Sequence, residues 1–188
     1  MSQTMRGQFL IAGKQLLDPS FYRTVVLIVE HNSEGAMGVV VNRPSSVTIA
    51  QALTEHFDLP DNDDVMFVGG PVEPSALFIL HNSAEMDQSE PAVVPNVYLG
   101  SNTSVFESVV NTASQGLQEL DFRIFSGCAG WGPKQLESEI DRGDWHLHPA
   151  CSQMVFHNDS YALWDLMLEK LQEQMGFPPA SKSKPEWN

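Results

Sequence analysis

The sequence predicts an α+β fold: a single domain with a mixed, mostly antiparallel sheet and flanking helices. Short strand-like runs are joined by turn residues, as in hairpins, and do not alternate strictly with helices as βαβ units would. The chain has 188 residues, of which 42% are apolar and 18% charged, values typical of one domain with a sizeable core. We therefore expect one domain over residues 1–177 and a loose polar tail at 178–188.

Three strand patterns open the chain. Residues 8–12 form a short apolar run, and residues 23–30 are almost continuously apolar and β-branched, as expected of a strand buried on both faces. Turn residues at 32–35 lead into a further strand at 37–41, so these two strands should form a hairpin. Pro44 has no N–H to donate to a neighbouring strand, and it ends this segment.

The middle of the chain is expected to hold two helices and three strands. Residues 48–57 have apolar side chains at every fourth position, which predicts a helix with one buried face. Residues 104–114 are expected to form a second helix, because Ser101, Asn102 and Thr103 before it are all competent N-cap residues. The strands are expected at residues 65–68, 76–80 and 93–99.

The run Gly127-Cys128-Ala129-Gly130-Trp131-Gly132 is the most distinctive part of the sequence. It follows a strand-like segment and precedes Pro133, whose fixed φ suits the first turn of a helix at 134–142. Three glycines in six positions predict a tight loop that presents backbone N–H groups to an anion or a substrate oxygen. The run matches neither a phosphate-binding loop nor a dinucleotide-binding motif, since Pro133 intrudes and the glycine spacing is inverted.

The C-terminal part of the chain predicts two short strands and a helix. The strands are expected at residues 145–148 and 153–156. Asn158 or Asp159 is the expected N-cap of the final helix. The apolar face of that helix consists of Trp164, Met167, Leu168, Leu171 and Met175.

The charge balance opposes several classes of partner. Ten basic residues against 24 acidic ones give a formal net charge of −14, which disfavours general binding to nucleic acid or to an anionic membrane. The first residues lack the pattern of a signal peptide, and no apolar run approaches the length of a membrane span. Two cysteines, Cys128 and Cys151, are too few for a disulfide framework. We therefore expect a cytoplasmic protein.

Catalytic and metal-binding patterns are not specific in this chain. Cys128 lies near a predicted helix start, where a thiolate is stabilised, but no histidine is placed beside it by the sequence. His146 and His148 would share one face of a strand, yet the cysteine and histidine that follow have no zinc-finger spacing. We predict no catalytic residue, no metal site and no cofactor.

Several segments, taken in order, resemble the AlgH/YqgE family of bacterial proteins over about residues 7–175. The resemblance is carried by residues 7–12, 18–26, 30–31, 35–44, 69–72, 80–81 and 127–139, and by Trp145. It implies a single α+β domain whose sheet bends into a pseudo-barrel. The family carries the label of transcriptional regulator, without an assigned activity or DNA-binding motif. It usually has an aromatic residue where this chain has Cys128, so the resemblance does not support a nucleophile at that position.

A ligand-binding cleft is the expected functional site. Arg23 and Arg43 each end an apolar strand, where a guanidinium must find a carboxylate, a carbonyl or a ligand. His31 and His81 also end strands, and we expect residues 127–132 to lie against one of those strand ends. The candidate ligand-binding residues are Arg23, His31, Asn42, Arg43, His81, Gly130, Trp131 and Gly132.

The leading functional hypothesis is a non-enzymatic regulatory protein that binds a small ligand or a protein partner. One alternative is a hydrolase that uses the rim of residues 127–132 with His31, Arg43 and His81. A second alternative is direct transcriptional control, which the negative charge and the lack of a recognisable helix-turn-helix oppose. Trp131 is expected to be buried against the helix that contains Leu136 and Ile140.

Overall fold

The protein, analysed as a computed structural model, is described here for residues 4–55, 63–86, 90–116 and 119–176. The strands are β1 (Gln8–Ala12), β2 (Val25–Asn32), β3 (Gly35–Val40), β4 (Pro44–Thr48), β5 (Val65–Val68), β6 (Val72–His81), β7 (Tyr98–Gly100), β8 (Phe122–Trp131) and β9 (Trp145–Pro149). The helices are α1 (Ile49–Leu53), α2 (Thr103–Gln115), α3 (Gln135–Asp141), α4 (Ser152–Val155) and α5 (Leu163–Gln174). The α+β prediction is confirmed, whereas the predicted tail at 178–188 and the end of the predicted helix at 56–57 lie outside the described residues.

The strands form one large mixed sheet in the order β4-β5-β8-β3-β2-β1-β9, and β6 and β7 branch from β8. The β5–β8 pair is parallel, and the other strand pairs of the described chain are antiparallel. β8 joins the two parts of the sheet, because its first half pairs with β5 and β6 and its second half pairs with β3. Among the described strands, β4 and β9 do not pair with each other, so the sheet is not a closed barrel.

The prediction of a glycine loop at residues 127–132 is wrong, because residues 127–131 belong to β8. Gly127 has a φ of +70°, and a Cβ atom there would lie 2.5 Å from the carbonyl oxygen of Gly70. Glycine is therefore needed where β8 changes direction between its two halves and the backbone of Gly70 packs closely against it. The glycine thus serves a bend in a paired strand, and not a loop that exposes its backbone.

The start of α3 offers no open anion site of the expected kind. Lys134, at the N-cap, has a φ of +60° and provides no side-chain cap. The N–H of Gly132 donates to Oε1 of Gln135 at 3.0 Å, so the helix covers this donor with its own side chain.

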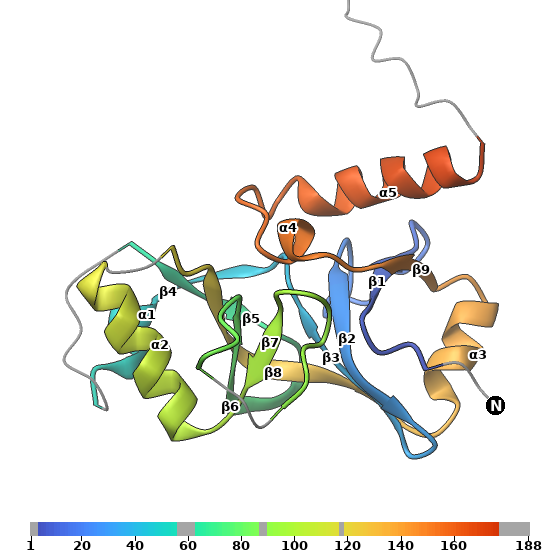
Figure 1. Ribbon diagram of the computed structural model, residues 1–188. Coiled ribbons are helices and arrows are strands. Elements are labelled where there is room, and N and C mark those ends of the chain that lie inside the picture. The colour runs from blue at the N-terminus through green and yellow to red at the C-terminus, as the bar shows by residue number, and fades with distance from the viewer. Residues whose placement is uncertain (1–3, 56–62, 87–89, 117–118, 177–188) are drawn as a thin grey trace, which may run out of the picture.

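Two groups of buried side chains hold the elements together. The larger group lies between the strands β1–β3 and α5. The residues that α5 contributes to it are Leu163, Trp164 and Met167. The smaller one lies under α1 and α2 and includes Leu53, Val109 and Ile124. Figure 1 shows this division, with α5 running beside β1 and β9 and with α1 and α2 at the other end of the molecule.

The C-terminal region departs from the prediction at two points. Residues 152–155 form the short helix α4 where a strand was expected at 153–156, since a short apolar run does not by itself distinguish the two. Val155 is buried, and its carbonyl oxygen accepts a hydrogen bond from the side chain of Arg123, where a strand residue would accept one from the backbone of its neighbour. Asp159 accepts from the N–H of Ala162 and so caps the turn before α5, whose own N-cap is Ala162.

Candidate functional site

Three of the eight candidate residues, Arg23, Asn42 and Arg43, meet in a hollow of about 360 Å³. The hollow lies where the start of β2, the end of β3 and the segment before α5 approach one another. We call it the arginine hollow, and it is lined by Tyr22, Arg23, Thr24, Asn42, Arg43, Pro44 and Tyr161. Its lining contains two guanidinium groups and no carboxylate.

Asn42 fixes the backbone of the arginine hollow. Its Oδ1 accepts from the N–H of Val25 at 2.8 Å, and its Nδ2 donates to the carbonyl oxygen of Arg23 at 3.0 Å. Arg23 has a φ of +55°, a left-handed conformation that costs a non-glycine residue about 1–3 kcal/mol. The amide of Asn42 therefore helps to hold Arg23 in a conformation that the chain would otherwise avoid.

Arg43 is held by backbone carbonyls. Its Nη1 donates to the carbonyl oxygen of Ser20 at 2.5 Å, and its Nη2 donates to that of Tyr22 at 3.3 Å. Burial lowers the pKa of Arg43, while Asp18 acts in the opposite direction. A guanidinium keeps its proton at neutral pH in proteins, so Arg43 places a positive charge in the hollow.

Arg23 has a weaker and more exposed set of partners. Its Nη2 donates to Oδ2 of Asp165 at 2.6 Å, and its guanidinium carbon lies 4.6 Å from the centre of the Trp164 ring. The side chains of Arg23 and Asp165 are 44% and 56% exposed, so their ion pair contributes at most about 1 kcal/mol. A ligand anion can therefore compete with Asp165 for this arginine.

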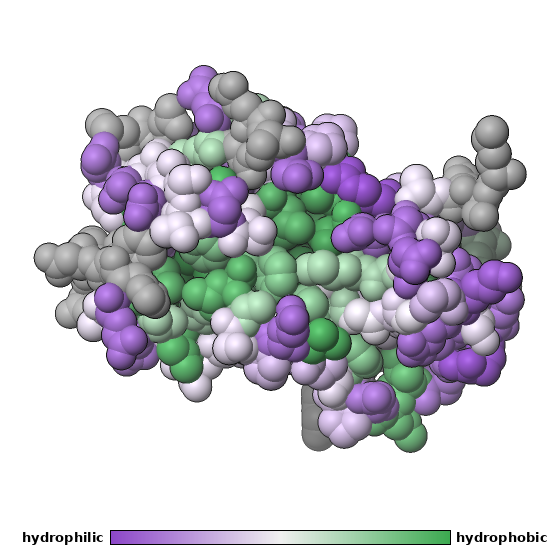
Figure 2. All heavy atoms as spheres, turned by 90° about the horizontal axis from the view of Figure 1, so that it is seen from below, coloured by the Kyte–Doolittle hydropathy of each residue, from purple (hydrophilic) through white to green (hydrophobic). Residues whose placement is uncertain are grey.

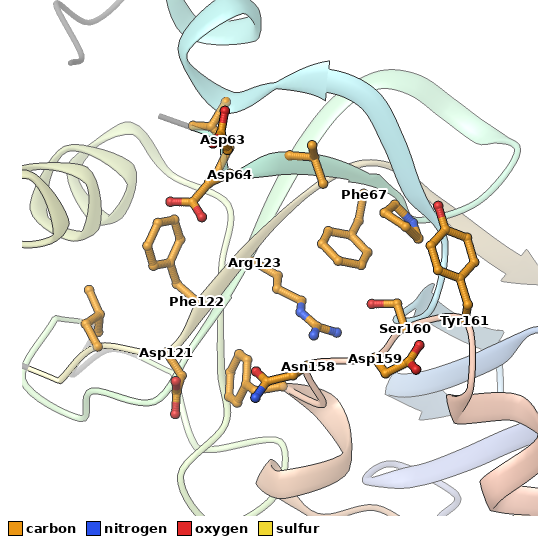
Figure 3. Close-up of a pocket in the computed structure, with 15 residues that line it drawn as sticks. Asp63, Asp64, Phe67, Asp121, Phe122, Arg123, Asn158, Asp159, Ser160 and Tyr161 are labelled. Carbon is orange, nitrogen blue, oxygen red and sulfur yellow. The ribbon is translucent and has the colours of Figure 1, made fainter. Parts of the chain in front are cut away.

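A larger hollow of about 680 Å³ adjoins the arginine hollow and shares Pro44 and Tyr161 with it. We call it the aspartate cleft. Its acidic and aromatic lining residues are Asp63, Asp64, Asp121, Asp159, Phe67, Phe122, Phe156 and Tyr161. Figure 3 shows Arg123 in the middle of this cleft, between Phe67 and the segment that carries Asn158 and Ser160.

Arg123 is a site residue that the sequence analysis did not select. Its Nη1 donates to the carbonyl oxygens of Val41 and Val155 at 3.0 and 2.8 Å, and its Nη2 donates to the carbonyl of His157. The guanidinium carbon lies 4.6 Å from the centre of the Phe67 ring. Arg123 therefore connects β8 to the end of β3 and to α4, and so shapes the floor of the aspartate cleft.

Burial lowers the pKa of Arg123 to about 10, and Asp121 acts in the opposite direction. The side chain is therefore still a cation at neutral pH. A signal for it was present in the sequence, because Arg123 stands between Phe122 and Ile124 in an apolar strand. The argument that selected Arg23 and Arg43, a guanidinium that needs partners at an apolar strand, applies to Arg123 equally.

His31 lies at the other end of the β2–β3 hairpin from Arg43. Its Nδ1 accepts from the backbone N–H of Met5 at 3.1 Å, so the ring proton is on Nε2, which donates to Oε1 of Glu137 at 3.1 Å. A backbone N–H bond to its carboxylate and the nearby His31 both lower the pKa of Glu137. These contacts attach the N-terminal segment and α3 to the end of β2.

Trp131 is buried, with 6% of its surface exposed, as expected from the sequence. Its indole N–H donates to Oε2 of Glu139 in α3 at 2.9 Å, and the same oxygen accepts from Trp145 at 2.9 Å. Phe21 packs against both indoles, with ring centres 6.1 and 5.4 Å away. Through these contacts β8, α3 and β9 meet at one carboxylate, that of Glu139.

The expected common rim is not assembled in the structure. The pairs His31–Ala36 and Ala36–Trp131 place residues 127–131 at the same end of the sheet as His31, with β3 between them. His81 instead pairs with Phe122, at the opposite end of β8, where it is fully buried and stacks on Tyr98. These ends are nine residue steps apart along β8, which corresponds to at most about 30 Å for an extended strand.

Cys128 does not have the environment of an activated nucleophile. It is 5% exposed, and burial, with a contribution from Glu73, raises the pKa of its thiol. A raised pKa reduces the thiolate fraction at neutral pH, and the thiolate is the reactive form.

The described residues contain neither a cluster of metal ligands nor a helix that could span a membrane. No group of three or more potential metal-ligating side chains comes together in that part of the chain. None of the helices that the structure describes has the length and apolar character needed to cross a bilayer.

Comparisons with known proteins agree with the fold. A family model described as AlgH-like matches residues 9–176. The UPF0301 protein of Myxococcus xanthus is 35% identical over 174 residues, covering 91% of each chain, and that of Chlorobaculum tepidum is 32% identical over 158 residues, covering 84% of this chain and 82% of the relative. The solution structure of the AlgH protein from Pseudomonas aeruginosa has a TM-score of 0.70 and 30% identity, covering 94% of this chain and 93% of that one. A Corynebacterium diphtheriae protein has the same fold, with a TM-score of 0.71 at 22% identity over 90% of this chain and 88% of that one.

Proposed function

We propose that this chain, which belongs to the AlgH-like family, is a non-catalytic binding protein whose small ligand places an anionic group in the arginine hollow. One observation carries the proposal: two guanidinium groups line a hollow whose lining residues include no carboxylate, in a protein with a net charge of −14. The carboxylate bonded to Arg23, that of Asp165, is exposed and is not among the lining residues. Guanidinium groups bind carboxylates and phosphates through paired N–H donors, which gives both affinity and orientation. The ligand class that fits this lining is a carboxylate or a phosphate.

The strained backbone of Arg23 supports the same proposal. A left-handed non-glycine residue persists only where its surroundings hold it, and such residues cluster at binding sites. Here the side chain of Asn42 supplies that constraint through its bond to the carbonyl of Arg23. The side chain of Arg23 is thereby positioned over the ring of Trp164.

The adjoining aspartate cleft extends the ligand class. Tyr161 and Pro44 border both hollows, so one molecule could occupy the two. Four aspartates line the cleft against one cation, Arg123, whose guanidinium already donates to three backbone carbonyls. The cleft therefore favours a positively charged group, by Coulomb attraction to the carboxylates and by cation–π contact with the aromatic rings. The ligand that fits both hollows carries an anionic group at one end and an amino or similar cationic group at the other.

In this proposal the protein acts in the cytoplasm. Its regulatory role depends on whether the ligand is bound, and not on contact with DNA. DNA binding is driven by basic residues that displace counterions from the phosphate backbone. A protein with a net charge of −14 is poorly suited to this. The hydrolase alternative is less well supported, because His31, Arg43 and His81 lie at three separate places in the fold.

The proposal is tested by titrating the full chain with inorganic phosphate while recording ¹H–¹⁵N spectra. We expect progressive shifts of the Trp164 indole N–H, which lies under Arg23 and donates to the carbonyl of Ala12. Arg23→Gln should remove most of this response, whereas Arg142→Gln, which removes an exposed arginine paired with Asp144, should retain it. Equal responses in both variants would mean that phosphate binds elsewhere.

A second candidate function is binding of a protein partner through an apolar face. Figure 2 shows apolar atoms gathered in a hollowed band between hydrophilic margins. Separately, a hollow of about 370 Å³ beside β2, β3, β6 and β7 is lined in part by Val29, Met37, Phe78, Val93 and Leu99. Exposed apolar surface marks interaction sites, and the lining of this hollow also includes the charged residues Arg6, Glu30 and Glu90. A protein that co-purifies with the wild type from its own host, and is lost on Phe78→Glu, would support this candidate.

A further inference from the structure

A third hollow, of about 420 Å³, lies between α5, β9 and α3, away from the arginine hollow. We call it the helix groove. Its apolar lining consists of Ile140, Trp145, Leu147, Leu168, Leu171 and Met175. Figure 1 shows α5 beside β9, and α3 lies at the same end of the molecule. A volume of this size and a mostly apolar wall are typical of small-molecule sites.

The apolar side chains at the mouth of the helix groove are exposed. Met175 is 70% exposed and Leu147 is 37% exposed, although both are large apolar residues. Leu168 and Leu171 are half-buried on the face of α5 that turns toward the groove. An apolar ligand would therefore remove a substantial apolar surface from water.

The charge of the groove is the reverse of that of the whole protein. Lys14 is the charged residue of its lining, and the other polar members are Gln15, His146 and Gln172. No carboxylate is among the lining residues, although the chain has 24 acidic residues. Glu169 and Glu173 of α5 are exposed and do not line the groove. An apolar channel with a single cation at its edge is complementary to an amphiphilic anion.

We propose that the helix groove binds a straight-chain alkyl carboxylate, with the hydrocarbon chain along Leu168 and Leu171 and the carboxylate beside Lys14. The carboxylate stays at the edge of the groove, because burying it would cost several kcal/mol. The amides of Gln15 and Gln172 offer further N–H donors at that edge. This site is independent of the arginine hollow and of the function proposed for it.

The test is a calorimetric titration of the full chain with hexanoate, octanoate and decanoate, each below its micelle concentration. The affinity should rise about fourfold for each added methylene group, until the groove is filled. Nonyltrimethylammonium, with the same nine-carbon alkyl chain and the opposite charge, should bind more weakly than decanoate. In ¹H–¹⁵N spectra recorded over the same ligand concentrations, the indole N–H signal of Trp145 should shift, since Trp145 lines the groove.

Variants locate the site. Lys14→Gln should weaken decanoate binding about two- to fivefold, the range for an exposed ion pair. Lys170→Gln, a lysine of α5 outside the lining, should leave the affinity unchanged. An affinity independent of chain length, equal binding of nonyltrimethylammonium and decanoate, or an unchanged affinity in Lys14→Gln would each overturn the proposal.

Discussion

Glu139 should be among the most important side chains for the stability of this fold. Its Oε2 accepts from the indole N–H groups of both Trp131 and Trp145, and these residues are only 6% and 2% exposed. In Glu139→Leu both indole donors lose their acceptor at sites that water does not readily reach. A buried donor left without a partner costs about 1–3 kcal/mol, so two of them cost roughly 2–6 kcal/mol.

Two further variants separate the hydrogen bonds from other effects of the change. Glu139→Gln keeps an acceptor oxygen and should lose much less stability than Glu139→Leu. Glu137→Leu removes a carboxylate of the same helix that is 43% exposed and bonded to His31, and should also cost less.

The free energy of unfolding should be measured by urea titration with far-ultraviolet circular dichroism, because the change itself alters the fluorescence of two tryptophans. If Glu139→Leu unfolds within about 0.5 kcal/mol of the wild type, the range of ordinary surface changes, the shared acceptor is not what connects β8, α3 and β9.

Four more outcomes are expected. Trp131→Ala should lower the free energy of unfolding by about 3–5 kcal/mol in urea titrations, as large-to-small core changes do. Cys128→Ser should leave phosphate binding nearly unchanged in calorimetry. Loss of phosphate binding in a variant that still folds would indicate a role for the thiol. The folded-state pKa of Glu137 is lowered, so the stability that this residue contributes should be present above its unfolded pKa of about 4.3 and lost as the pH falls through its folded pKa. The free energy of unfolding of the wild type and of Glu137→Gln, measured across acidic pH, tests this direction. Random duplex DNA should bind more weakly than the ~10⁻⁴–10⁻⁶ M of non-specific binders, and micromolar retardation at physiological salt would reveal an overlooked basic face.

The elements of the fold were predictable where local pattern decides them. The bounds of β1 and β5 match the expected residues 8–12 and 65–68, because each is a short apolar run between turn residues. The glycine run was misjudged because its conformation depends on a distant segment. Gly127 is required by the carbonyl of Gly70, and only the pairing of the strands brings these two residues together.

The candidate site was predictable in part. Arg23 and Arg43 could be selected because a guanidinium at the end of an apolar strand needs partners, and the structure brings both into one hollow with Asn42. Their separation from His31 follows from the register of the β2–β3 hairpin, in which His31 pairs with Ala36 near the turn. The predicted hairpin, with its turn at residues 32–35, already implied this separation, because a hairpin turn fixes the register of its strands. The place of His81 could not be predicted in this way, because its pairing with Phe122 joins segments far apart in the chain.

The most direct test of the central claim is native mass spectrometry of the protein purified gently from its own host. The wild type should carry a small molecule with a carboxylate or phosphate group. Arg23→Gln should lose this molecule, and Arg142→Gln should retain it, since Arg142 lies outside the arginine hollow. A wild type without a bound small molecule, or the same bound mass in Arg23→Gln, would contradict the assignment of the arginine hollow as the binding site.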